Sequence, residues 1–277
     1  MIGARSLPPN ATAGQRLAHW ALWIFAVLVC LFLVTPILAI IPLSFSAGAF
    51  LHYPLPGLSL RWYAEFFGSE FWLPALWNSL IVGVGATTLA TGLGTLAALG
   101  LWRARFPGRT VAMAVLASPM VVPEIITAVA IYFAFAPVGL ANTYLGLILS
   151  HTALATPFVV VTVLATLSGF DPNLARASAS LGADPLTTFR RVTLPIILPG
   201  VVSGALFAFA TSFDDVILAL FLAGPDQRTL PRQMFSGIND NISLTITAAA
   251  TFLVLTSVVL MAAITALRRR AERLKGG

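Results

Sequence analysis

The chain has 277 residues, of which 58% are hydrophobic and only 9% are charged, and its mean hydropathy is +0.92. Soluble domains carry about 25% charged residues, so this composition excludes an ordinary soluble protein and indicates that lipid is the solvent. The single cysteine, Cys30, excludes a disulfide framework and a cysteine-based metal site. The formal net charge of +6 suggests nucleic acid in a soluble protein, but here the charge positions give another explanation.

Six apolar stretches are long enough to span a bilayer, which takes about 20 mostly apolar residues. We therefore predict an all-α membrane protein with spans at 20–46, 76–102, 110–136, 143–169, 196–223 and 244–267. The first is too long for the core of a signal peptide and has no convincing cleavage site beside it, so we expect it to be retained. The resulting division is an N-terminal tail (1–19), a transmembrane domain (20–267) and a basic C-terminal tail (268–277).

The distribution of Lys and Arg predicts the orientation. Thirteen of the sixteen basic residues fall in the two tails and in the loops at 103–109 and 171–195, and the remaining three are Arg61, Arg228 and Arg232. Positive residues stay on the cytoplasmic side, so both termini are expected in the cytoplasm. The basic tail is then a topology anchor that also contacts anionic lipid, and no nucleic acid partner is expected.

The loops on the other side differ in character. Residues 47–75 are rich in aromatic residues and prolines, which indicates an interfacial segment with a short helix from Leu60 to Phe67. Residues 224–243 are polar and long enough for a structured outer loop.

Residues 171–195, here called the polar segment, read DPNLARASASLGADPLTTFRRVTLP between the fourth and fifth spans. Asp171-Pro172 and Asp184-Pro185 each place an N-cap before a proline at the first helical position. Gly182 suits a left-handed helix terminator. We predict two short helices joined at Gly182 and closed by Leu194-Pro195. The alternative is an interfacial loop that lies on the bilayer surface.

The polar segment resembles the EAA loop of permease subunits of bacterial ABC importers. That pattern is Glu-Ala-Ala, three residues, Gly, nine residues and Ile-x-Leu-Pro. Here Arg176-Ala177-Ser178 stands at the Glu-Ala-Ala positions, Gly182 is in register, and Val192-Thr193-Leu194-Pro195 closes the motif. Arg176 reverses the charge of the family glutamate, so the contact made by that acid is not carried over to this chain.

The resemblance covers most of the chain and looks closest to the spermidine/putrescine-type permeases. Its further supports are 77–80 (WNSL), 121–125 (VVPEI), 212–215 (SFDD), 223–225 (AGP) and 229–231 (TLP). It implies six helices of type I, MetI-like architecture in a bacterial inner membrane, with alternating access as the mechanism. The coupling loop would dock on an ATPase through Ala175, Arg176, Ala177, Ser178, Gly182, Ala183, Asp184, Pro185, Leu194 and Pro195.

The resemblance also implies partners. These are a second permease subunit, which we expect to be a different chain, two cytoplasmic ATPase subunits, and an extracytoplasmic solute-binding protein. One check does not depend on the family: a P-loop needs a lysine after its glycines, and the only lysine is Lys275 in the tail. ATP and Mg²⁺ are therefore expected on the partner subunits, with no cofactor in this chain and no catalytic role for it.

Three acids, Glu124, Asp214 and Asp215, lie within predicted spans. Intramembrane acids are costly and usually face a cavity or a partner. Pro119 and Pro123 are expected to kink the third span beside Glu124. Adjacent helical residues point about 100° apart, so only one of the two aspartates is expected to face the route.

No basic residue is expected within the spans to neutralise these acids, which favours an organic cation such as a polyamine as the solute. The predicted substrate pathway comprises Glu124, Asp214, Asp215 and Asn78. Protonated acids that hold helices together are the structural alternative.

Two other functions remain open from the sequence. An ion-coupled secondary transporter would use Glu124 or Asp214 as a proton or cation site. A membrane-embedded enzyme would need a nucleophile–base or metal constellation, and none is visible. His19, His52 and His151 lack zinc-type spacing.

Overall fold

The computed structural model describes residues 12–103, 106–240 and 243–275, and all regular elements among them are helical. Five helical stretches are long and apolar enough to cross a membrane, and the number is six when a bent helix pair is counted as one span. The five are α1 (Ala13–Leu43), α3 (Trp72–Arg103), α6 (Tyr144–Leu167), α8 continuing into α9 (Pro185–Phe213) and α12 (Thr245–Lys275). This confirms the all-α membrane fold.

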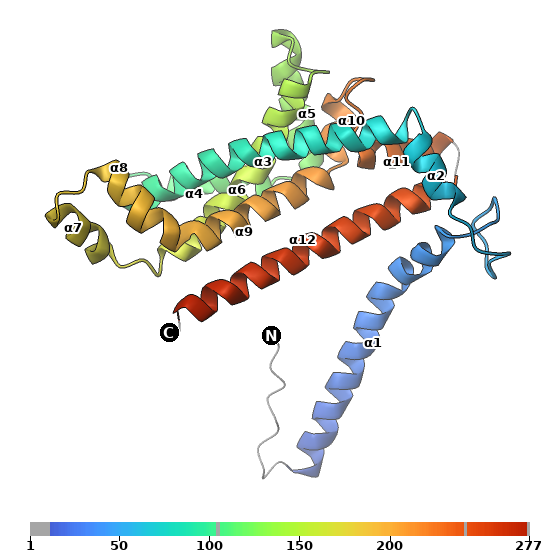
Figure 1. Ribbon diagram of the computed structural model, residues 1–277, viewed down its shortest axis with the longest axis horizontal. Coiled ribbons are helices and arrows are strands. Elements are labelled where there is room, and N and C mark those ends of the chain that lie inside the picture. Colours follow the sequence, from blue (N-terminus) through green and yellow to red (C-terminus); the bar gives the residue numbers. More distant parts are fainter. Residues whose placement is uncertain (1–11, 104–105, 241–242, 276–277) are drawn as a thin grey trace.

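The core of the molecule is the packing of α3, α6 and α9, which lie side by side in Figure 1. Small residues allow the close approach of these helices. A Cβ added at Gly94 of α3 would lie 2.7 Å from Val159 Cβ of α6, and one at Gly204 of α9 would lie 2.5 Å from Thr162 Oγ1. Larger side chains at these two glycines would therefore push the helices apart.

The first helix leaves this core, as Figure 1 shows, and α1 has no buried residues. It begins at Ala13 because Thr12 caps it, accepting a hydrogen bond of 3.3 Å from the backbone N–H of Gln15. Parts of both predicted tails are helical, since α1 includes residues 13–19 and α12 runs on to Lys275. Arg5 and the last two residues lie outside the described residues.

The third predicted span, 110–136, is not one helix. It consists of α4 (Arg109–Ala117), the 3₁₀ turn η1 (Ser118–Met120) and α5 (Glu124–Phe135), with a bend of 102° between the two halves. Pro123 has extended geometry (ψ 128°) at the start of α5, and a proline disfavours helix in the residue before it. The expected kink is therefore a full break, and Glu124 is the first residue of a helix rather than the middle of one.

The polar segment forms α7 (Pro172–Ser180), α8 (Pro185–Thr188) and the π-turn η3 (Phe189–Thr193), which continues into α9 (Leu194–Phe213). The prediction that Leu194-Pro195 ends the second helix is wrong. Pro195 is the second residue of α9, where a missing N–H costs little, and the wider turn of η3 precedes it.

The fifth predicted span, 196–223, also breaks. Helix α9 ends at Phe213, and α10 (Ile217–Leu222) starts after a three-residue interruption that contains both Asp214 and Asp215. The prediction that the two acids follow one another on a regular helix is therefore wrong.

The two ends of the bundle differ. One end carries α2 (Arg61–Gly68) and α11 (Leu230–Asp240), which correspond to the short interfacial helix and the structured loop expected there. A 3₁₀ turn, η2 (Ala136–Val138), leads from α5 toward α6. Helices α7 and α8 project from the opposite end (Figure 1).

Candidate functional site

The polar segment has the local geometry that its sequence predicts. Asp171 accepts a hydrogen bond of 2.9 Å from the backbone N–H of Asn173, and Asp184 accepts one of 3.2 Å from that of Thr187. Hydrogen bonding to Thr187 lowers the pKa of the Asp184 carboxyl from its ordinary value. Gly182 has φ +83°, the left-handed conformation that separates the two helices.

One face of the polar segment is fixed to the membrane helices. Ala175 packs against the core cluster that includes Phe170 and Ile197. Phe170 meets Trp102 edge-on, with ring centroids 5.4 Å apart. Ser178 Oγ and Thr188 Oγ1 share a hydrogen bond of 3.0 Å across the turn. The segment is therefore held at both of its helices.

Outside these contacts the polar segment exposes apolar side chains. Leu181 is 89% exposed, and Leu174 and Leu186 are also exposed. Arg176 is exposed and donates a hydrogen bond of 3.2 Å to Asn173 Oδ1 within its own helix. Of the other residues predicted here, Ala177, Gly182, Asp184, Pro185 and Pro195 are exposed and Ala175, Ser178, Ala183 and Leu194 are partly buried. The exposed leucines were not singled out from the sequence, although apolar residues in a polar stretch are a signal for a contact.

The helix breaks bring the three predicted acids together. Glu124 at the start of α5 and Asp214 and Asp215 after α9 border an open hollow of about 480 Å³, here called the acid hollow. Its other lining residues are Ala210, Thr211, Val216 and Ile217. Asp214 is exposed, whereas Asp215 is only 6% exposed. Both aspartates therefore line the hollow, but Asp214 is open to it and Asp215 is buried in its wall.

Asp215 has buried partners. Its Oδ1 and Oδ2 accept hydrogen bonds of 3.4 and 3.3 Å from the backbone N–H groups of Leu218 and Ala219. Its Oδ2 also lies 3.4 Å from Nε2 of His151 on α6. Asp215 therefore contacts a histidine that the sequence analysis did not connect with these acids. Sequence reasoning missed His151 because its partner is 64 positions away.

Asn78 does not border the acid hollow. Its Nδ2 donates hydrogen bonds of 2.9 Å to the carbonyl oxygens of Asp226 and Arg228, and its Oδ1 accepts one of 2.7 Å from the Tyr144 hydroxyl. Asn78 instead lines a second hollow of about 390 Å³ with Glu70, Asp226, Arg228 and Gln233 among its other residues. Its amide fixes the loop that follows α10.

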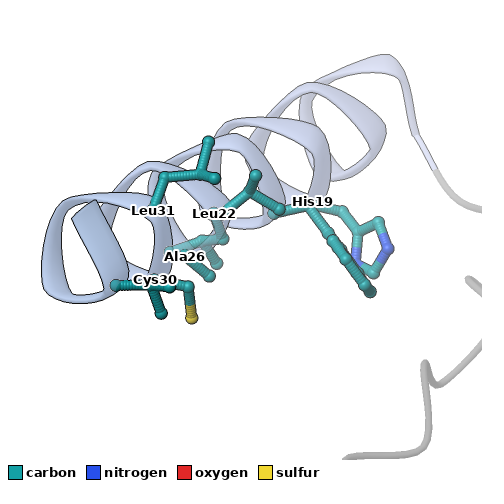
Figure 2. Close-up of a pocket in the computed structure, with 8 residues that line it drawn as sticks. His19, Leu22, Ala26, Cys30 and Leu31 are labelled. Carbon is teal, nitrogen blue, oxygen red and sulfur yellow. The ribbon is translucent and has the colours of Figure 1, made fainter. Parts of the chain in front are cut away.

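A third hollow, of about 500 Å³, lies along α1. Figure 2 shows its labelled residues, His19, Leu22, Ala26, Cys30 and Leu31, as side chains of a single helix. A surface formed by one apolar helix does not enclose a polar solute. Among the described residues there is also no group of three or more side chains suited to hold a metal ion. The acid hollow and the polar segment are the two candidate sites considered below.

Comparison with known proteins decides between the alternatives. Residues 90–273 match the family described as "Binding-protein-dependent transport system inner membrane component". The chain belongs to this family. It is therefore a bacterial inner-membrane permease subunit of an ABC importer. This result excludes the two alternatives considered above, a secondary transporter and a membrane-embedded enzyme.

Several relatives extend the match over most of the chain. The chain is 33% identical over 237 residues to the spermidine/putrescine transport system permease protein PotC of Haemophilus influenzae, covering 86% of this chain and 92% of the relative. It is also 33% identical over 229 residues to the putrescine transport system permease protein PotI of Escherichia coli K12, covering 80% and 81%.

Two solved structures share the fold. A chain of a bacterial ABC transporter involved in alginate import superposes with a TM-score of 0.73 at 14% identity, covering 93% of this chain and 99% of that one. A chain of the MetNI methionine ABC transporter superposes with a TM-score of 0.55 at 22% identity, covering 74% and 97%. These matches confirm the expected architecture.

Family membership fixes the division of labour. The permease subunit is non-catalytic and carries no cofactor, and ATP is hydrolysed on separate subunits. A binding-protein-dependent importer also has a solute-binding protein. The polar segment and the acid hollow therefore belong to a translocation subunit rather than to an enzyme.

Proposed function

We propose that this permease translocates a polyamine or another organic cation. The observation that carries the proposal is the acid hollow, where Glu124, Asp214 and Asp215 meet beside two broken helices. Ammonium groups form charge-assisted hydrogen bonds with carboxylates, and intramembrane acids that line a water-accessible cavity mark solute routes. The names of the relatives, which are spermidine/putrescine and putrescine permeases, support the same solute class.

The experiment is uptake by the complete complex in proteoliposomes. Radiolabelled putrescine and spermidine are offered with the binding protein outside and ATP inside, and a neutral sugar and an amino acid serve as comparison solutes. ATP-dependent accumulation of the amines alone supports the proposal. Accumulation of a neutral or anionic solute without the amines contradicts it.

We propose that the polar segment is the coupling element that docks on the ATPase. Its support is the combination of one face packed on the membrane helices and one face that exposes Leu174, Leu181 and Leu186. A rigid element of this kind transmits a movement of the ATPase to α9, since η3 joins it to that helix without interruption. Site-directed crosslinking from position 181 to the ATPase tests the contact, and its absence in an active complex opposes the proposal.

Alternating access follows from differential contacts. The ATP-bound and ATP-free states of the ATPase would hold the polar segment in two positions, and each position would favour one opening of the route. The acid hollow would then open alternately to one side of the membrane and to the other. Transport uphill by this chain alone, without an ATPase, would exclude the mechanism.

We propose that both termini and the polar segment lie in the cytoplasm. The support is the concentration of thirteen of the sixteen Lys and Arg residues in these segments. Single cysteines introduced at positions 10 and 270 of a Cys30→Ala chain test the orientation. They should resist a membrane-impermeant maleimide in intact cells and react after permeabilisation, whereas a cysteine at position 52 should react at once.

We further propose that the partner permease is a different chain. Arg176 stands where the family motif has glutamate, so a second permease with the acid in its own loop would supply the missing contact. Purification of the complex through a tag on this chain identifies the subunits by mass spectrometry. Two copies of this chain and no second permease in an active complex would contradict the heterodimer.

A further inference from the structure

The strongest unexplained feature is a buried polar cluster behind the acid hollow. His151 is 1% exposed, and its Nδ1 shares a hydrogen bond of 2.9 Å with Ser212 Oγ of α9. Its Nε2 lies 3.4 Å from Asp215 Oδ2 and is a buried atom with no hydrogen-bond partner among the described residues. The cluster joins α6, α9 and the break before α10, where a buried imidazole is costly unless both nitrogens are used.

The protonation of the His151 imidazole determines which group lies next to Asp215. When the Ser212 hydroxyl donates to Nδ1, the proton of the neutral ring is on Nε2, the ring nitrogen that lies 3.4 Å from Asp215 Oδ2. The doubly protonated ring presents the same Nε2–H. In both species His151 offers a donor to Asp215.

Asp215 is consequently approached from two sides. The backbone N–H groups of Leu218 and Ala219 lie on one side and the imidazole on the other. The Glu124 side chain borders the same hollow as Asp215. Two carboxyl groups that meet in one hollow share a proton when nothing else orients them, because like charges oppose joint ionisation.

We infer that His151 is a positioning residue for the cation site, which competes with Glu124 for the Asp215 carboxyl so that Glu124 and Asp214 stay available to a cation in the acid hollow. This inference rests on the proposed function. Ser212 acts behind His151 by fixing the ring. Without the imidazole, the Asp215 carboxyl turns toward Glu124, the pair shares a proton, and the hollow loses negative charge.

The first test measures transport by the complete complex in proteoliposomes with radiolabelled putrescine. His151→Phe keeps the ring volume and removes both nitrogens, whereas His151→Gln keeps an N–H donor. His151→Phe should raise KM about tenfold, the effect of one hydrogen bond to a charged group, and leave the maximal rate and the yield of complex within about twofold. His151→Gln should restore KM to within about threefold, and His52→Phe, in an exposed segment, serves as control.

A second test needs no solute. Dicyclohexylcarbodiimide adds to protonated carboxyl groups in apolar surroundings, and mass spectrometry locates the adduct. In the same purified complex, His151→Phe should increase labelling of the Asp215–Glu124 pair about tenfold, with labelling of Asp214 unchanged.

The outcomes separate the inference from the proposed function. If putrescine is not transported but the labelling changes as stated, the solute assignment falls and the role of His151 stands. If putrescine is transported and His151→Phe leaves both KM and labelling unchanged, the role of His151 is overturned. A lower yield of complex with a normal KM, or equal defects in His151→Phe and His151→Gln, would also overturn it, because a purely structural residue behaves in this way.

Discussion

The polar segment and the acid hollow are built in opposite ways. In the polar segment, the hydrogen bonds that set the turn join residues two to ten positions apart, from Asp171 with Asn173 to Ser178 with Thr188. In the acid hollow, the bond between His151 and Ser212 joins residues 61 positions apart. A site made of local contacts can be predicted from the sequence. A site made of contacts between distant residues forms only when the helices pack.

The two regions should also differ in how their variants affect transport. The polar segment depends on backbone conformation and an exposed surface, so its variants should uncouple ATP hydrolysis from transport while solute affinity persists. The acid hollow depends on charge, so its variants should lower the affinity for the solute while coupling persists. The following changes test this separation, starting with the largest expected effect.

Gly182→Val should abolish coupled transport. Gly182 has φ +83° and no atom within 4 Å of an added Cβ, so the effect comes from the backbone and not from a clash. A β-branched residue disfavours this conformation by about 1–2 kcal/mol and would reorient α7 against α8. ATP hydrolysis and uptake are measured together in proteoliposomes.

The matched control is Gly139→Val, which has φ +71° and equally open surroundings away from the polar segment. This variant should keep the wild-type ratio of solute transported to ATP hydrolysed. Loss of coupling in both variants would remove the special role of the polar segment.

Glu124→Gln combined with Asp214→Asn should raise the KM for putrescine by about 10- to 100-fold, since each carboxylate contributes one or more charge-assisted hydrogen bonds to the cation. The yield of complex should stay normal because Asp214 is exposed and Glu124 is only partly buried. Glu70→Gln, outside the acid hollow, is the control. Loss of assembly with unchanged KM would favour acids that only hold helices together.

Asp184→Ala should reduce coupling by a smaller factor, about two- to threefold, because the start of α8 loses its cap.

The lowered pKa of Asp184 determines how coupling should depend on pH. A depressed folded pKa gives stabilisation that is present above the ordinary value of 3.8 and is lost only as pH falls through the lower folded value. The protonation of Asp184 should therefore have no effect on coupling at any pH above about 5. If the wild type lost coupling near pH 6 and the Asp184→Asn variant did not, the role of Asp184 as an ionised cap would be contradicted.

Arg176→Glu should have the smallest effect, with uptake within about twofold of the wild type. The guanidinium makes one exposed hydrogen bond to Asn173, and such contacts contribute little. Pull-down of the ATPase by the detergent-solubilised permease measures docking directly. Abolished docking would show that Arg176 has a partner of its own on the ATPase.

Six spans, the caps at Asp171 and Asp184 and the left-handed Gly182 follow from the sequence because each depends on composition or on residues a few positions apart. Tertiary structure decided the features that depend on contacts between residues far apart in the sequence. The third and fifth spans break, because Pro123 and the residues at 214–216 interrupt helices whose ends then pack against one another. Only that packing turns three scattered acids into one hollow, buries Asp215 against His151 and moves Asn78 to a different surface. Long-range contacts of this kind depend on how helices cross, which no short stretch of sequence encodes.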